Sequence, residues 1–145
     1  MTTANYRHKS HCVFECDYHI VFATKYRRKV INPGVKAFIL GRIREIEEHY
    51  PDLIFKTVNT DKDHMHLLVS IPPTTGVGKV VGIIKTNTAR GIKTAIPFLK
   101  EAYWDRDGIW SDGYFVSTVG INKEAIEKYI ENQGQLDSGQ YRPGL

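Results

Sequence analysis

Hydrophobic and polar residues follow two different periods along the chain, and together they predict four strands and three helices. Runs rich in β-branched, aromatic and other apolar residues indicate strands at residues 12–23, 53–60, 63–71 and 114–119. Apolar residues three and four positions apart indicate amphipathic helices at residues 33–49, 76–95 and 123–133. Residues 97–112 show neither period, and we expect an irregular connection there.

The order of these elements predicts an α+β fold. A strand, a helix, two strands joined by a short turn, a helix and a strand match the ferredoxin-like, or RRM-like, pattern of a four-stranded antiparallel sheet with two helices on one face. In that pattern the first and third strands are central neighbours, and the helix at 123–133 is an addition. We expect a single domain over residues 1–145, with flexible segments at 1–10 and 134–145.

The strand at 63–71 carries the strongest candidate chemistry. Strand alternation gives it one apolar face, formed by Met65, Leu67, Val69 and Ile71. His64 and His66 then share the opposite face, which we expect to be the open face of the sheet. Residues two positions apart lie about 7 Å apart along a strand, so both imidazoles can bind one cation. A His-x-His pair also arises by chance in a chain with six histidines, so the strand context is what supports a site.

The turn before this strand and the last helix add candidate partners for the histidines. Asp61 and Asp63 either orient an imidazole, contact a metal, or only form the turn. Tyr129 and Gln133 lie one turn apart on the same side of the helix. An amide oxygen is an acceptable ligand for a hard divalent ion, and a phenol beside such an ion can attack a phosphodiester.

Charge and composition permit a polyanionic partner without requiring one. The net charge is +4, and basic residues surround Tyr26 at residues 24–29. This cluster is either a solvated strand end or a phosphate-contacting surface with a tyrosine that stacks on bases. Cys12 and Cys16 would lie about 13 Å apart on an extended strand, so we expect reduced thiols. No apolar run is long enough to span a membrane, and we expect a cytoplasmic protein.

The chain resembles the HUH-type single-tyrosine transposases of small bacterial insertion sequences, which move as single-stranded DNA. Four sequence blocks carry the resemblance, at residues 18–27, 63–69, 113–120 and 129–133. The resemblance implies that His64 and His66 bind Mg²⁺ or Mn²⁺, with Gln133 as the third protein ligand. It also implies that Tyr129 attacks single-stranded DNA, which leaves a 5′-phosphotyrosine link and a free 3′-hydroxyl. Attack by another 3′-hydroxyl then reseals a new junction.

The same resemblance implies partners for the chain. The family recognises DNA hairpins near the element ends and is dimeric, and its tyrosine helix can serve the histidine pair of the other subunit. We interpret four basic residues as contacts to the DNA backbone, namely Arg27, Arg28, Lys85 and Arg90. The sequence departs from the family at Lys62, where proline is more common, and we expect no effect on the chemistry.

Two alternatives stay open from the sequence. A domesticated relative that acts on chromosomal hairpin repeats would have the same residues, and only the flanking DNA would separate it from an insertion-sequence transposase. A non-catalytic nucleic-acid-binding module would stack bases on aromatic residues of the open sheet face. The two histidines occupy the positions where those aromatic residues would lie.

Overall fold

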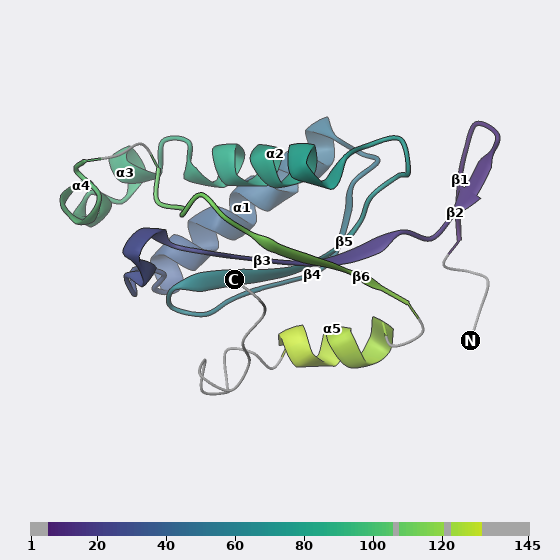
Figure 1. Ribbon diagram of the computed structural model, residues 1–145. Helices are drawn as coiled ribbons and strands as arrows, with labels where there is room; N and C mark the ends of the chain where they lie inside the picture. Colours follow the sequence, from purple (N-terminus) through teal and green to yellow (C-terminus); the bar gives the residue numbers. More distant parts are fainter. Residues whose placement is uncertain (1–5, 106–107, 121–122, 132–145) are drawn as a thin grey trace.

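The computed structural model describes residues 6–105, 108–120 and 123–131. In this part of the chain, an antiparallel sheet has the strand order β4 (Ile54–Thr60), β5 (His64–Ser70), β3 (Asp17–Ala23) and β6 (Phe115–Val119) (Figure 1). The first and third strands of the predicted pattern, β3 and β5, are central neighbours, with Tyr18 opposite Val69 and Ala23 opposite His64. This topology confirms the predicted α+β, ferredoxin-like fold.

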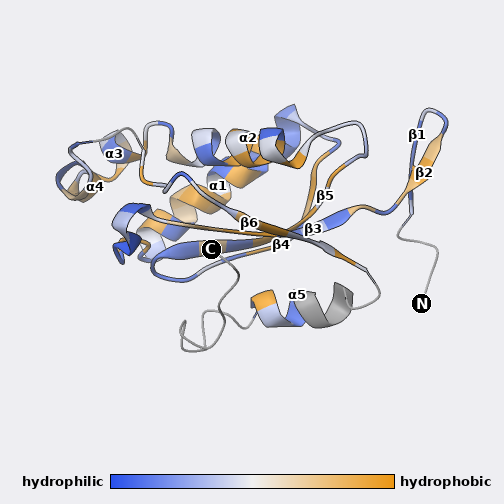
Figure 2. Cartoon of the chain, in the orientation of Figure 1, coloured by the Kyte–Doolittle hydropathy of each residue, from blue (hydrophilic) through white to orange (hydrophobic). Residues whose placement is uncertain are grey.

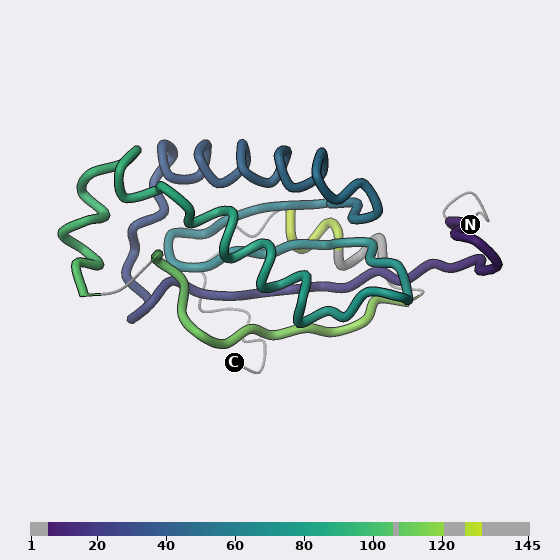
Figure 3. The backbone as a smooth tube through the Cα atoms, turned by 90° about the horizontal axis from the view of Figure 1, so that it is seen from above, coloured from purple at the N-terminus to yellow at the C-terminus, as the bar shows by residue number. Residues whose placement is uncertain are grey.

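Helices cover both faces of the sheet. α1 (Pro33–His49) and α2 (Val77–Ala89) lie on one face, and α5 (Lys123–Glu131) lies on the other (Figure 1). Figure 3 looks down onto α1 and α2 and shows α5 partly behind the strands. α1 begins where the sequence predicts, because the Asn32 side chain accepts a hydrogen bond from the Val35 amide at 2.9 Å and proline fits the first turn.

The hydrophobic core lies between the sheet and the helices α1 and α2. The sheet contributes alternate residues of its central strands, among them Ile20, Phe22, Met65 and Leu67. The helices contribute their apolar edges, among them Ile39, Ile43, Val80 and Ile84. Figure 2 shows the hydrophobic stretches of β5, α1 and α2 that form this layer. No helix in the described ranges is long and apolar enough to cross a membrane.

The single strand predicted at residues 12–23 is in fact two strands. β2 (Cys12–Phe14) pairs with β1 (Arg7–Lys9) in a hairpin that projects from the body, and β3 begins only at Asp17 (Figure 1). Within the segment expected to be flexible, residues 7–9 form a paired strand. Arg7 donates to the Asp52 carbonyl at 2.8 Å, and the Lys9 ammonium lies 2.6 Å from the Asp52 carboxylate. These contacts tie the hairpin to the turn after α1.

The helix predicted at residues 76–95 is also interrupted. α2 ends at Ala89, and Gly91 adopts a φ of 73°, a left-handed conformation that glycine tolerates. The chain then forms the short helices α3 (Ile92–Ala95) and α4 (Phe98–Ala102), so the segment predicted to be irregular begins with a helical turn. The apolar spacing continues past Gly91 to the buried Ile92, which is why the sequence indicates one longer helix.

Candidate active site

β5 places His64 and His66 on the same face of the sheet. Their ring centroids lie 4.7 Å apart, with the ring planes at 63°. Met65 and Leu67 alternate with them and belong to the core under α1 and α2. The two imidazoles therefore lie on the face that is turned away from those helices, as strand alternation predicts.

Helix α5 covers this face, so the prediction that the histidine pair lies on an open surface is wrong. The exposed fraction is 6% for His64 and 0% for His66. Asn59 of β4 donates from Nδ2 to the carbonyls of Ile130 at 2.9 Å and Glu131 at 3.2 Å. The Ile130 side chain is fully buried. An amphipathic helix has to bury its apolar edge, and the second face of the sheet supplies the surface.

α5 also brings Tyr129 next to the histidine pair. The centroid of its ring lies 6.2 Å from that of His66, with the ring planes at 78°. The phenol oxygen is buried. Gln133, the other residue predicted on this helix, lies outside the described residues. The structure thus brings together His64, His66 and Tyr129, which come from two segments more than 60 residues apart in the sequence.

Asp63 orients the ring of His64. Its Oδ1 lies 2.6 Å from His64 Nδ1, and its Oδ2 lies 3.4 Å from Arg27 Nε. Burial alone would raise the pKa of Asp63, but the hydrogen bond and charge of His64 and the charge of Arg27 together lower it. An ionised carboxylate only accepts hydrogen bonds, so Nδ1 of His64 carries a proton toward Asp63, and Nε2 is the ring nitrogen that faces away from this carboxylate.

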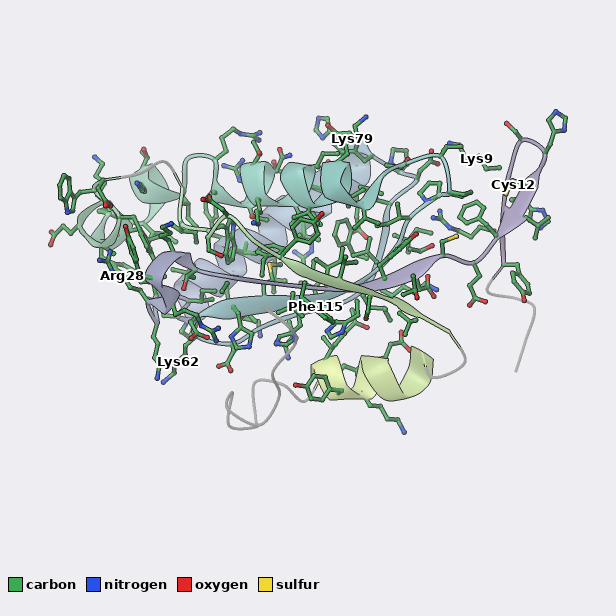
Figure 4. All side chains as sticks on the ribbon, viewed as in Figure 1. Lys9, Cys12, Arg28, Lys62, Lys79 and Phe115 are labelled. Atoms are coloured by element: carbon green, nitrogen blue, oxygen red, sulfur yellow. The ribbon has the colours of Figure 1, made fainter. Side chains whose placement is uncertain are left out.

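His19 of β3 adds a third imidazole that sequence reasoning missed. Its ring stacks on that of His66, with centroids 5.9 Å apart and planes at 15°. Its edge meets the ring of Phe115 of β6, the residue that Figure 4 labels. Only the pairing of β3 with β5, which sets His19 opposite Leu68, places this ring on the site face. A search for spaced motifs within one strand has no means of finding it.

Burial and neighbouring imidazoles keep His66 neutral. Burial, followed by the charges of His64 and His19, lowers the pKa of His66 to about 3. Burial also lowers the pKa of His19. Metals bind the unprotonated imidazole, so His66 is in the correct state to act as a ligand at neutral pH.

The described side chains fit part of a site for a divalent ion. Imidazole nitrogens and a carboxylate oxygen are suitable donors, and Asp61 Oδ2 lies 4.0 Å from His64 Nε2, beyond hydrogen-bond distance. This oxygen is buried and has no hydrogen-bond partner within the described ranges, so a cation beside Nε2 would satisfy it. In the same ranges, no three His, Cys, Asp or Glu side chains are arranged so that they could hold one metal ion. The donor set therefore requires further ligands to complete it.

The four basic residues predicted to contact DNA do not form one patch. Arg27 and Arg28 follow β3, and the guanidinium of Arg28 lies 4.8 Å from the ring centroid of Tyr26. Lys85 and Arg90 belong to α2 and its end, on the face of the sheet that α1 and α2 cover, whereas Arg27 and Arg28 lie at the end of the strands (Figure 1). The Lys85 ammonium donates to the carbonyls of Ser111 and Gly113, both at 2.8 Å, and burial lowers its pKa. Its contacts favour a structural role, whereas the Arg90 side chain is 59% exposed.

Comparison with known proteins identifies a family and relatives that match this chain in sequence. The family "Transposase IS200 like" matches residues 12–133. The transposase for insertion sequence element IS200 of Salmonella typhimurium is 34% identical over 128 residues, which cover 88% of this chain and 83% of that protein. The ISDra2 transposase TnpA of Deinococcus radiodurans is 34% identical over 122 residues, which cover 83% of this chain and 86% of that protein.

Solved structures of other proteins share the fold. The crystal structure of a putative transposase from Deinococcus radiodurans R1 has a TM-score of 0.71 and 30% identity, and the match covers 88% of this chain and 97% of that one. The REP-associated tyrosine transposase, solved bound to a REP hairpin, has a TM-score of 0.61 and 12% identity over 88% of this chain and 71% of that one. At that identity the second match shows the fold alone. From the family match and the identity to its members, the chain belongs to the IS200-like transposase family.

Proposed function

We propose that this transposase cuts and rejoins single-stranded DNA at insertion-sequence ends, with Tyr129 as the nucleophile. Family membership establishes the general activity, which is the cutting and transfer of DNA strands. The observation that carries the finer proposal is the position of Tyr129, whose ring lies 6.2 Å from that of His66 on the face that holds the histidine pair.

The proposed reaction is a transesterification. The Tyr129 phenol oxygen attacks a phosphorus of the DNA strand and forms a new P–O bond, while the bond from phosphorus to the 3′-oxygen breaks. The phenol proton is lost, and the leaving 3′-oxygen gains a proton, so the products are a 5′-phosphotyrosine and a 3′-hydroxyl. Attack by a different 3′-hydroxyl reverses these changes and releases the tyrosine. The bond energy stays in the phosphotyrosine, so no ATP is needed.

We also propose that His64 and His66 hold a Mg²⁺ or Mn²⁺ ion, with Gln133 as the third protein ligand. When bound, such an ion neutralises charge on the phosphate oxygens. The neutral state of His66 and the orientation of His64 by Asp63 support this assignment. Asp61 is a further candidate ligand, because its Oδ2 lies beside the available nitrogen of His64.

Both imidazoles are buried, and α5 lies on the sheet face that holds them, with Tyr129 against His66. We therefore propose that α5 moves when DNA reaches the histidine pair. We also propose a homodimer in which the helix can serve the histidine pair of the other subunit. The test is to mix His66→Ala protein with Tyr129→Phe protein. If the mixture forms a DNA adduct, Tyr129 of one subunit acts at the histidine pair of the other. If it forms none, this arrangement is contradicted.

The proposed DNA partner is a hairpin near the cut site. One structural relative was solved bound to a REP hairpin, and the net charge of +4 suits a polyanion. The second candidate function is a domesticated enzyme that acts on chromosomal hairpin repeats, for which the hairpin in that relative is the supporting observation. The identity to IS200 transposases favours the first candidate. Insertion-sequence ends beside the gene would identify an insertion-sequence transposase. Hairpin repeats dispersed in the chromosome would identify the domesticated enzyme.

The central test is formation of a covalent adduct. Protein incubated with single-stranded DNA from the element ends and Mg²⁺ should yield a protein–DNA band that survives denaturation. Tyr129→Phe should abolish this band, whereas Tyr50→Phe, at the exposed end of α1, should retain it. A band of equal strength from Tyr129→Phe, or none from the unchanged protein, would contradict the proposal.

A further inference from the structure

Arg27 is linked to the histidine pair by a short chain of contacts. Its Nε lies 3.4 Å from Oδ2 of Asp63, and the other carboxylate oxygen lies 2.6 Å from Nδ1 of His64. The Asp63 carboxylate is therefore held between a guanidinium and an imidazole. Figure 4 labels their sequence neighbours Arg28 and Lys62 at the same end of the sheet.

The backbone that presents Arg27 is strained and firmly held. Tyr26 and Arg27, in the short helical turn η2 (Lys25–Arg27), have φ values of 62° and 53°. These left-handed conformations are unfavourable for residues with a side chain and persist only where surrounding contacts fix them. The Thr24 amide donates to the Asp63 carbonyl at 2.8 Å, and the Tyr103 hydroxyl donates to the Lys25 carbonyl at 2.8 Å.

The exposure of Arg27 argues against a large contribution of the ion pair to stability. The Arg27 side chain is 52% exposed, and a solvent-screened ion pair of this kind contributes little to the free energy of folding. The contact instead constrains direction, because a guanidinium on Oδ2 limits rotation of the Asp63 carboxylate. A fixed carboxylate keeps its other oxygen on Nδ1 of His64 and holds the plane of that ring.

We propose that Arg27 is a positioning residue for the metal site, and that it acts through Asp63 to direct Nε2 of His64 toward the divalent ion. This inference rests on the proposed function, because it requires His64 to be a metal ligand. It replaces our interpretation of Arg27 as a contact to the DNA backbone. The carboxylate that pairs with Arg27 belongs to the protein itself, on Asp63, the residue before His64.

The experiment measures Mn²⁺ binding to the full chain without DNA, by titration calorimetry and by electron paramagnetic resonance. Arg27→Ala should weaken Mn²⁺ affinity roughly tenfold. This is the low end of the loss seen when a residue that hydrogen-bonds to a metal ligand, without binding the metal itself, is removed. Arg27→Lys, which keeps the charge and loses the planar fork, should give an intermediate affinity. Arg28→Ala removes the same charge one residue away and should leave the affinity unchanged.

A double-mutant cycle tests whether Arg27 acts through Asp63. In an Asp63→Ala background, Arg27→Ala should have no further effect on Mn²⁺ affinity, which a merely structural role would not predict. Thermal unfolding of each variant checks that the fold is intact. If Arg27→Ala does not fold, Arg27→Lys replaces it in the cycle.

Two results would overturn the proposal while leaving the proposed function intact. One is Mn²⁺ affinity that does not respond to either Arg27 substitution. The other is a loss for Arg27→Ala that is equally large without Asp63. An Arg27→Ala protein with normal Mn²⁺ affinity but weaker, less salt-dependent DNA binding would identify a phosphate contact instead. Failure of the unchanged protein to bind Mn²⁺ would overturn the proposed metal site and this inference together.

Discussion

The two faces of the sheet are built from the same strands, but one forms the hydrophobic core and the other holds the candidate site. On one face, Ile20, Phe22 and Leu67 pack under α1 and α2 as an ordinary hydrophobic core. On the other face, His19, His64 and His66 lie together under α5, which contributes Tyr129. Because strand side chains alternate, β3 and β5 supply both layers without sharing a residue. Stability and chemistry can therefore change independently in this fold.

The covers of the two faces also differ in how they are attached. α1 is a 17-residue helix with a capped start and four buried aliphatic residues. α5 is a 9-residue helix, and its described contacts with the sheet include two hydrogen bonds from Asn59 and the buried Ile130. We expect the core face to stay closed while the site face opens for DNA.

The largest expected effect is on the site face. His66→Ala should reduce adduct formation at least about 100-fold, because a bound metal contributes several kcal/mol to stabilisation of the transition state. Its effect on the free energy of unfolding should be smaller than that of a core truncation. Gel quantification of the adduct and urea unfolding measure the two quantities. Full activity in His66→Ala would remove the distinction between the faces.

The next prediction concerns the neighbouring residue on the core face. Leu67→Ala should lower the free energy of unfolding by about 3 kcal/mol, because it removes buried methyl groups and leaves a cavity. At temperatures where the variant is folded, adduct formation should stay close to that of the unchanged protein. If Leu67→Ala were stable but inactive, the two layers would not be independent.

A third prediction uses pH to separate the faces. An unfolded histidine binds a proton near pH 6.5, whereas folded His66 does so only near pH 3. The unfolded state therefore binds more protons between these values, so the contribution of His66 is fully present above about pH 6.5 and is lost as the pH falls toward about 3. In EDTA, the free energy of unfolding should fall by roughly 2–3 kcal/mol more for the unchanged protein than for His66→Gln between about pH 7.5 and 4.5. Equal losses would show that His66 is not held neutral.

The smallest expected effect concerns the attachment of α5. Backbone amides of α5 should exchange with deuterium faster than those of α1. Among the side chains that the structure describes, α5 buries one aliphatic residue, Ile130, whereas α1 buries four. Asn59→Ala removes two hydrogen bonds to the end of α5 and should speed exchange there by about fivefold, which corresponds to about 1 kcal/mol. Exchange in α1 should not change. A helix α5 as protected as α1 would contradict the idea that the site face opens.

Sequence reasoning reached the fold and the residue types of the site because both follow from local patterns. Alternation over residues 63–71 separates the histidines from Met65 and Leu67, and Asn32 with its following proline marks the start of α1. The break between β2 and β3 has no clear local signal, because Glu15 and Cys16 include no glycine or proline and residues typical of strands continue on both sides. The break at Gly91 was concealed by apolar spacing that continues into α3.

The remaining features of the site depend on contacts between segments far apart in the chain. His19 joins the site through strand register, and Arg27 reaches Asp63 across 36 positions. α5 packs on the sheet face that holds the histidine pair. An amphipathic pattern predicts that the helix buries one edge, but it does not predict against which surface. A single sequence therefore identifies the residues of this candidate site better than it identifies their surroundings.

The most direct measurement of the central claim is the anomalous diffraction of Mn²⁺ in crystals of the protein bound to single-stranded DNA from an element end. We predict one strong peak at roughly 2.1 Å from a ring nitrogen of each of His64 and His66, with the Tyr129 phenol of one subunit positioned against the DNA phosphate beside it. A peak elsewhere, with DNA seated away from these imidazoles, would contradict the account.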